Sequence, residues 1–173
     1  KAKAEDKSVA RIHTGDPSLY GATGEQMREL NRLGIEYETV AGVTSMAASA
    51  AALNLELTMP EISQTVTITR TPGRTPMPES LENIAKTGGT IAFFLSAGQG
   101  GLISETLINA GWDKETPVKL VYKATWKDQK TAACFLHNLE ETLIANNMTK
   151  HTMILVGQAL KGLPESSSKL YDR

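Results

Sequence analysis

A short apolar run that ends in a polar, glycine-containing turn constrains the fold of this chain more than any other feature. Residues 9–12 (VARI) have the composition of a strand, and the turn at residues 14–18 (TGDPS) leads into a helix-like segment. In an open α/β sheet, ligands bind in the loops at the carboxyl ends of strands. Gly15 allows close approach of the backbone, Pro17 stiffens the turn, and Asp16 supplies a hydrogen-bond acceptor. The turn therefore predicts a loop that binds a polar ligand.

The same turn has a second interpretation. In it, the Asp16 carboxylate or the Ser18 hydroxyl only caps the helix that follows, because either group can accept hydrogen bonds from the first helical N–H groups. The local sequence leaves both interpretations open.

Short apolar runs and helix-like segments alternate along the whole chain. Runs bounded by glycine, proline or polar residues predict strands over residues 8–13, 36–40, 65–70, 90–95, 118–123 and 153–156. Apolar periodicity and helix-end signals predict helices over residues 19–33, 44–53, 80–86, 102–110 and 131–146. This alternation predicts an α/β fold with largely parallel sheets. The pattern breaks at residues 57–61, around Pro60, which predicts a domain boundary there.

Composition excludes several classes of function. The net charge of −1 argues against a nucleic-acid-binding surface that depends on bulk positive charge. No apolar run approaches the roughly 18 residues of a membrane-spanning helix. The single cysteine, Cys134, allows no intrachain disulfide and fits a cytoplasmic location, and its place in a predicted helical apolar pattern indicates core packing. The three histidines are too scattered in the sequence to predict a metal site.

A glycine-rich stretch at residues 98–101 (GQGG) precedes a predicted helix. Such a loop can cradle phosphate, but this one lacks the Lys-Ser/Thr pair of a P-loop. We interpret it as a flexible connection.

Several short motifs follow one another along the chain. They are TGDPSLYGA (residues 14–22), GVTS (42–45), TRTPGRTPMPE (69–79), YKATW (122–126) and SKLYD (168–172). In this order and spacing the chain resembles the tetrapyrrole methylases that use S-adenosylmethionine. The stretches at residues 69–79 and 168–172 are similar to the branch that methylates carbon 11 of precorrin-4 or cobalt-precorrin-4 in cobalamin biosynthesis. The resemblance extends over nearly the whole chain.

The resemblance implies a two-domain α/β fold with mixed, largely parallel sheets and a cleft between the domains. Residues 1–60 would be the C-terminal part of the N-terminal domain, and residues 61–173 the C-terminal domain. Members of the family begin upstream with a strand and a Gly-Pro-Gly loop that this sequence does not contain, so we expect an N-terminally truncated chain. The resemblance also implies a homodimer that takes a tetrapyrrole substrate. Together with the composition, we expect a cytoplasmic protein that binds neither nucleic acid nor membrane.

The resemblance further implies which residues carry the chemistry. Expected contacts with S-adenosylmethionine are Thr14, Gly15, Asp16, Leu19, Thr44, Ser45, Leu95 and Ala124. Methyl transfer from a sulfonium mainly requires a near-attack geometry, so a strong acid or base is not needed. Asp16 is the one titratable group in the set, and it either assists proton loss as a catalytic residue or contacts the ligand.

Expected substrate-binding residues are Arg70, Arg74 and Tyr20. The two arginines suit the acetate and propionate groups of a tetrapyrrole because guanidinium donates two parallel hydrogen bonds to a carboxylate.

Three other functions stay open at this point. One is a different tetrapyrrole methylase, such as the uroporphyrinogen-III enzyme. Another is a non-catalytic fragment, and the third is a nucleotide-binding regulatory protein that uses the same loops.

Overall fold

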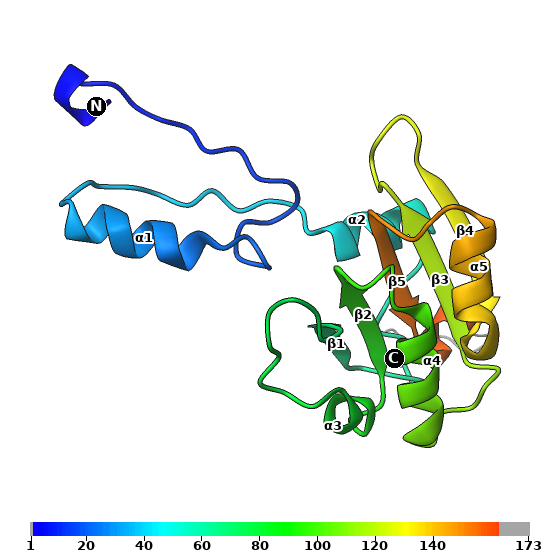
Figure 1. Cartoon of the computed structure of the whole chain (residues 1–173). Helices are drawn as coiled ribbons and strands as arrows, with labels where there is room; N and C mark the ends of the chain where they lie inside the picture. The colour runs from blue at the N-terminus through cyan, green and yellow to red at the C-terminus, as the bar shows by residue number, and fades with distance from the viewer. Residues whose placement is uncertain (1, 163–173) are drawn as a thin grey trace, which may run out of the picture. The chain divides into compact units, whose positions relative to one another are not determined.

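The computed structural model describes residues 2–162 (Figure 1). The chain divides into two compact units, Lys1–Ala47 and Ala48–Arg173. The domain boundary predicted at residues 57–61 lies after this division, within the second unit. There the Thr90 hydroxyl donates a hydrogen bond of 2.9 Å to the Leu57 carbonyl oxygen, and Met59 is buried. The segment around residue 57 therefore packs within the second unit.

The first unit contains a short 3-10 turn, η1 (Lys3–Glu5), and one longer helix, α1 (Thr23–Arg32). Helix α1 is amphipathic, with Met27 and Leu30 on its apolar side, yet none of its residues is buried. None of residues 2–47 is buried. This unit is therefore held by turns and backbone contacts, and it has no apolar core of its own.

The strands predicted over residues 8–13 and 36–40 are not formed, and this prediction is wrong for the described chain. A strand requires a hydrogen-bonded neighbour, and the described residues of this unit pair with none. Val9, Ile12 and Val40 are 77%, 92% and 74% exposed. The apolar composition indicated a buried strand, but composition alone does not supply the partner.

The second unit is built on a five-stranded sheet. Its strands are β1 (Val66–Arg70), β2 (Thr90–Phe94), β3 (Pro117–Tyr122), β4 (Lys130–Phe135) and β5 (Thr152–Val156), in the order β1-β2-β5-β3-β4. Only β1 and β2 pair in parallel, and the other three pairings are antiparallel. The prediction of an α/β fold with a mixed sheet is confirmed, whereas the expectation that the pairing is largely parallel is wrong for this unit.

The strand directions place three carboxyl ends at one edge of this sheet. Strand β1 runs parallel to β2, and β2 and β3 are both antiparallel to β5. Consequently β1, β2 and β3 all point the same way, and the chain leaves each of them at the same edge. Ligands bind at such carboxyl edges in open α/β sheets.

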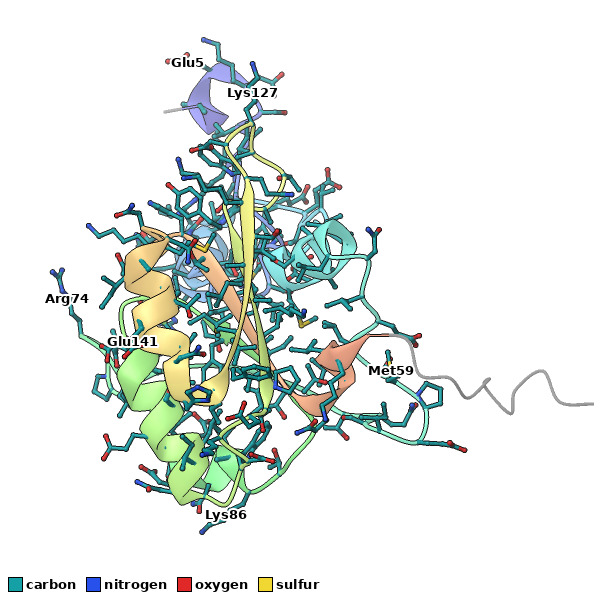
Figure 2. The ribbon with its side chains drawn as sticks, turned by 90° about the vertical axis from the view of Figure 1, so that its right-hand side faces the viewer. Glu5, Met59, Arg74, Lys86, Lys127 and Glu141 are labelled. Carbon is teal, nitrogen blue, oxygen red and sulfur yellow. The ribbon has the colours of Figure 1, made fainter. Side chains whose placement is uncertain are left out.

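The core lies between the sheet and the helices α3 (Leu81–Ala85), α4 (Gly100–Asn109) and α5 (Leu139–Ala145). Phe93, Ile103, Leu120 and Ile154 are fully buried in it. Glu141 of α5 and Met59 lie on opposite sides of the sheet (Figure 2). The second face is covered in part by η3 (Gln158–Lys161), whose Ala159 and Leu160 are also buried.

The helix predicted over residues 131–146 is wrong in its first part. Residues 130–135 form β4, which pairs with β3 along its whole length, and η2 (Leu136–Asn138) then leads into α5. Exposure alternates along β4, as it does in an edge strand with one covered face. The long-range pairing with β3 decides the structure here, and helical spacing in the local sequence does not reveal it.

Candidate functional site

Two loops of the first unit, residues 14–18 and 42–45, lie against each other. The Asp16 carboxylate joins them. Its Oδ1 accepts a hydrogen bond of 2.8 Å from the Ser18 backbone N–H, and its Oδ2 accepts one of 2.8 Å from the Gly42 backbone N–H. The Ser18 hydroxyl also donates to Oδ1. The structure thus brings together the two loops in which the sequence places cofactor contacts.

Glycines make this approach of the two loops possible. A Cβ atom at Gly42 would lie 2.2 Å from the Gly15 carbonyl oxygen, a distance that no side chain tolerates. Gly15 itself has a φ of 74°, in the left-handed region that favours glycine. A side chain at residue 42 would therefore push the two loops apart.

The electrostatics of Asp16 favour a charged carboxylate. Its pKa is lowered, first by the hydrogen bond from the Ser18 hydroxyl and then by the N–H groups of Gly42 and Ser18. Hydrogen bonds donated to the carboxylate stabilise its charged form and so lower its pKa. A carboxylate stabilised in this way is a weak general base, so the geometry supports a contact or positioning role for Asp16.

Thr44 and Ser45 stand at the start of helix α2 (Ser45–Ala52). The Thr44 Oγ1 accepts a hydrogen bond of 3.3 Å from the Met46 backbone N–H, which is the pattern of a helix N-cap. The Thr44 hydroxyl therefore caps the helix, and a ligand contact at this residue would have to form while this hydrogen bond is kept.

The remaining predicted residues of the first unit follow the same turn. The Leu19 N–H donates a hydrogen bond of 3.3 Å to the Asp16 carbonyl oxygen and closes the turn. Thr14 precedes the turn and is exposed. Tyr20 is 45% exposed and has a φ of 55°, a conformation that residues other than glycine adopt infrequently.

In the second unit, strained backbone marks the carboxyl ends of β2 and β3. Leu95 follows β2 with a φ of 55°, and its side chain is 79% exposed. Lys123 and Thr125 follow β3 with φ values of 45° and 72°, and the predicted contact Ala124 lies between them. A positive φ is a genuine outlier for a β-branched residue such as Thr125. Strain of this kind is concentrated at ligand-binding positions in proteins.

Side chains after β3 form an ordered cluster around Lys123. The Lys123 Nζ is 2.6 Å from Asp128 Oδ2 and lies over the rings of Tyr122 and Trp126, at 5.0 and 5.4 Å from their centroids. The ion pair with Asp128 raises the pKa of Lys123. Trp126 is 60% exposed at this edge of the sheet. The cluster fixes the segment that contains Ala124.

The two predicted arginines differ in their surroundings. Arg70 is the last residue of β1 and is half-buried, and its guanidinium donates to backbone carbonyl oxygens of the loop that follows. Arg74 lies in that loop and is exposed, and its side chain points away from the sheet (Figure 2). The Arg70 guanidinium is thus bound to its own loop, whereas the Arg74 side chain extends outward.

Comparison with known proteins identifies the family. The family model of the Tetrapyrrole (Corrin/Porphyrin) Methylases matches residues 1–140. The chain belongs to the tetrapyrrole methylases. It is 48% identical to a cobalt-precorrin-4 C(11)-methyltransferase of Priestia megaterium, over 98% of this chain and 67% of the relative. The chain therefore spans about two thirds of the length of that relative.

Solved structures agree with the family. A cobalt precorrin-4 methyltransferase, described as a cobalamin biosynthetic enzyme, superposes with a TM-score of 0.89 at 48% identity, over 92% of this chain and 67% of that one. A uroporphyrin-III C-methyltransferase of Thermus thermophilus in complex with S-adenosylhomocysteine superposes with a TM-score of 0.74, over 89% of this chain and 64% of that one. The latter is 22% identical and shows that the fold is shared.

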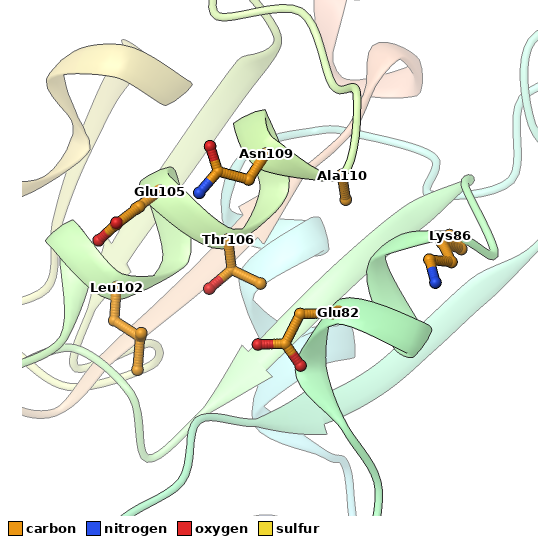
Figure 3. A pocket seen from close by; sticks show the side chains of 7 residues that line it. All are labelled: Glu82, Lys86, Leu102, Glu105, Thr106, Asn109 and Ala110. Carbon is orange, nitrogen blue, oxygen red and sulfur yellow. The ribbon is translucent and has the colours of Figure 1, made fainter.

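The structure of this tetrapyrrole methylase has a hollow of about 310 Å³ in its second unit, and no predicted site residue lines it. It is formed between α3 and α4, with Glu82 and Lys86 on one side and Glu105, Thr106 and Asn109 on the other (Figure 3). Both helices cover the sheet and do not form its carboxyl edge. The hollow is therefore not the site that the strand ends indicate.

Two of the glycines at residues 98–101, Gly100 and Gly101, are packing residues in a helix, so the interpretation of this stretch as a flexible connection is wrong for them. Gly100 and Gly101 belong to α4. A Cβ atom at Gly100 would lie 2.8 Å from Leu143 Cδ1 and 3.0 Å from Glu140 Cα. At Gly101 it would lie 2.6 Å from Glu140 Oε2. Helix α5 therefore packs directly on the first turn of α4, and the Glu140 carboxylate lies against Gly101.

The structure describes residues 2–162. Within that range no three His, Cys, Asp or Glu side chains gather in a group that could hold a metal ion. None of the helices in the same range has both the length and the apolar character needed to cross a bilayer. The SKLYD motif at residues 168–172 lies outside the described residues.

Cys134 lies on β4 and is half-buried, in contrast to the helical position that its spacing predicted. Burial raises the pKa of its thiol. A thiol that stays protonated is a poor nucleophile, so the structure supports the packing role expected for Cys134.

Sequence reasoning missed the groups that hold the strand ends in place. Ser96 is fully buried, and its hydroxyl accepts hydrogen bonds of 2.7 Å from the Thr71 N–H and 2.9 Å from the Thr71 hydroxyl. The Gln99 amide donates a hydrogen bond of 2.8 Å to the Pro72 carbonyl oxygen. These partners are more than twenty residues apart, and no local pattern links them.

Proposed function

We propose that this chain is part of an S-adenosylmethionine-dependent methyltransferase that methylates carbon 11 of precorrin-4 or of its cobalt form. The observation that carries the proposal is the 48% identity, over 98% of the chain, to a relative named for that reaction. A solved structure of a cobalt precorrin-4 methyltransferase at the same identity supports it.

The backbone at the sheet edge of the second unit fits a nucleoside ligand. Leu95 and Ala124 have no polar side-chain groups, so only their N–H and C=O groups can bind a ligand. Apart from the sheet ladder, neither backbone is hydrogen-bonded to any residue in the described range. Because φ is positive at residues 95, 123 and 125, the backbone N–H and C=O groups there turn away from the direction of the hydrogen bonds between strands. Leu95 and Ala124 would thus contact the cofactor through their backbone.

The loops of the first unit supply a second set of groups. The Gly15–Gly42 contact and the Asp16 bridge hold the two loops in one arrangement. Asp16 would keep its charge and position backbone donors, and we propose no proton transfer to it. Thr14, Leu19, Thr44 and Ser45 stay predicted cofactor contacts, and Tyr20 a predicted substrate contact.

S-adenosylmethionine, when bound, supplies the methyl group on a positively charged sulfur. The task of the protein is then to hold the methyl donor and the accepting carbon in line, which can account for a large part of the rate. This fits an edge formed by backbone groups and ordered loops. The homodimer and the cytoplasmic location that the resemblance implies stay predictions.

Methyl transfer tests the proposal directly. The protein in its natural length is incubated with S-adenosylmethionine carrying an isotope-labelled methyl group and with precorrin-4, cobalt-precorrin-4 or uroporphyrinogen III. We expect a labelled product from a precorrin-4 acceptor, with NMR locating the label on carbon 11. Label transferred only to uroporphyrinogen III would replace the proposal with the alternative methylase.

Calorimetric titration of S-adenosylhomocysteine separates the remaining alternatives. Binding by the natural-length protein together with silence from the present chain would identify the chain as a non-catalytic fragment. Binding of ATP in preference to S-adenosylhomocysteine would indicate a regulatory protein. Silence of the natural-length protein toward S-adenosylhomocysteine would contradict the methyltransferase assignment.

A further inference from the structure

The loop that follows β1, residues 71–76, is tied to the last residue of that strand. The Arg70 Nη1 donates hydrogen bonds of 3.2 and 3.3 Å to the carbonyl oxygens of Thr71 and Thr75. Its Nη2 donates hydrogen bonds of 3.3 and 2.8 Å to the carbonyl oxygens of Thr75 and Pro76. A guanidinium offers five donors in a rigid fork, and here both terminal nitrogens are committed to backbone acceptors.

The segment that follows β2 fixes the same loop at its base. Ser96 binds the N–H and the hydroxyl of Thr71, and it donates a hydrogen bond of 2.7 Å to the Phe94 carbonyl oxygen. Gln99 binds the carbonyl oxygen of Pro72. Since Arg70 is paired with Phe94 in the parallel register, both anchors act at the carboxyl edge of the sheet. The loop is therefore held from two sides.

Arg74 is presented at the exposed part of this held loop. The structure gives its guanidinium no hydrogen bond and no ion pair with a residue of the described range, and its side chain points outward (Figure 2). Pro72 and Pro76 on either side fix φ and limit the conformations of the loop. A group on a preorganised loop loses less conformational entropy when it binds a ligand.

We propose a division of roles between the two arginines: Arg74 binds a carboxylate of the ligand, and Arg70 is a positioning residue that acts through Arg74. This rests on the proposed function, because the ligand is a peripheral carboxylate of the tetrapyrrole substrate. It differs from the symmetrical expectation that both arginines contact carboxylates, since the donors of Arg70 are already used on the loop.

Kinetics of the natural-length enzyme test this division. Arg74→Gln is expected to raise the KM for the tetrapyrrole about tenfold, with kcat and the Kd for S-adenosylhomocysteine unchanged, because a charge-assisted bond is lost in the ground state and the transition state alike. Arg70→Gln is expected to raise KM by a smaller factor. The double variant should equal Arg74→Gln, since Arg70 acts through Arg74.

Three kinetic results would overturn the proposal while the enzyme stays active. An unchanged KM in Arg74→Gln would remove the carboxylate contact. Independent, multiplying effects of the two substitutions would show that Arg70 contacts the substrate itself. Arg70→Lys is the matched control: it keeps the charge but loses the fork, so we expect it to behave as Arg70→Gln. A wild-type KM in Arg70→Lys would also contradict the positioning role.

Tryptic cleavage gives a readout that does not depend on catalysis. Trypsin cuts after arginine, and the bond that follows Arg74 lies in the held loop. We expect Arg70→Gln to speed cleavage at this bond several-fold at an unchanged melting temperature, and unchanged cleavage would contradict the positioning role. If the wild-type enzyme neither binds nor methylates a tetrapyrrole, the proposed function and the ligand of Arg74 both fail, while the cleavage rate still decides what Arg70 does.

Discussion

Three buried serines of the second unit allow the hydrogen bonds of the sheet edge to be measured against matched controls. Ser96 is fully buried and takes part in three hydrogen bonds, with the N–H and the hydroxyl of Thr71 and the carbonyl oxygen of Phe94. Ser104 is 9% exposed and donates one hydrogen bond of 2.6 Å to the Leu136 carbonyl oxygen. Ser49 is fully buried, and its hydroxyl has no partner among the described residues.

The free-energy changes should follow these bonds. A buried donor or acceptor that loses its partner costs about 1–3 kcal/mol, whereas a typical hydrogen bond contributes about 1 kcal/mol net. Ser96→Ala leaves the buried Thr71 N–H unpaired and removes two further bonds, so we expect a loss of about 3 kcal/mol. Ser104→Ala should cost about 1–2 kcal/mol. Ser49→Ala removes a buried unpaired hydroxyl and should be neutral or stabilising.

Urea unfolding followed by circular dichroism measures all three variants on one scale, because the midpoint shifts with stability while the slope reports the surface exposed. Ser96→Ala should also raise the KM for the tetrapyrrole, since Thr71 anchors the loop of Arg74. Equal destabilisation by all three substitutions would refute the reasoning, because burial is similar and only the hydrogen bonds differ. A stabilised Ser96→Ala variant would refute it as well.

Three other changes test single contacts. Asp16→Asn replaces one of the two acceptor oxygens by an NH2 group, so the side chain can no longer accept from both the Ser18 and the Gly42 N–H groups. This change should raise the Kd for S-adenosylhomocysteine about tenfold by calorimetry, as expected for a lost charge-assisted bond. Because the pKa of Asp16 is lowered from 3.8, the bridge should persist above that pH and be lost only as the pH falls through the lower folded value. A break in the kcat profile near neutrality that Asp16→Asn abolishes would instead assign Asp16 as a base. Gly42→Ala should abolish that binding because its Cβ meets the Gly15 carbonyl oxygen, whereas the control Gly24→Ala, with no atom within 4 Å, should leave it intact. Gly100→Ala should lower stability by about 1–3 kcal/mol through overpacking against α5, and an unchanged stability would contradict the packing role of Gly100.

The sequence predicts those elements whose signals are local. Strands β1, β2, β3 and β5 were predicted within one or two residues, because each is a short β-branched or aromatic run between glycine, proline or polar residues. Strand β4 was not, because TAACF has no strong strand signal and its apolar residues also fit helical spacing. Its pairing with β3 is a tertiary effect that overrides local preference. The antiparallel character of the sheet was missed for the same reason.

The candidate site follows a similar division. Gly15, Asp16 and the loop at residues 42–45 were recognisable as motifs, but the hydrogen bond from the Gly42 N–H to Asp16 spans 26 positions of sequence. The Thr71–Ser96 bonds span 25 positions. Local patterns name the residues of a loop, whereas the fold determines which loops meet. Residues that fasten loops together are therefore found only in the structure.

The residues with strained backbone show the same difference between what a local motif predicts and what only the structure reveals. Leu95 and Ala124 were expected on resemblance alone, since an aliphatic side chain gives no chemical signal for a ligand. In the structure both lie directly after strands that end at one edge, with positive φ at Leu95 and on either side of Ala124. A left-handed conformation at a non-glycine residue costs of order 1 kcal/mol or more and persists only where the surroundings impose it. The ion pair of Lys123 with Asp128 and the hydrogen bond of 2.7 Å from the Thr125 N–H to the Gln129 side chain impose it after β3. After β3 the backbone conformation at this sheet edge is thus set by side chains that hold the backbone in place.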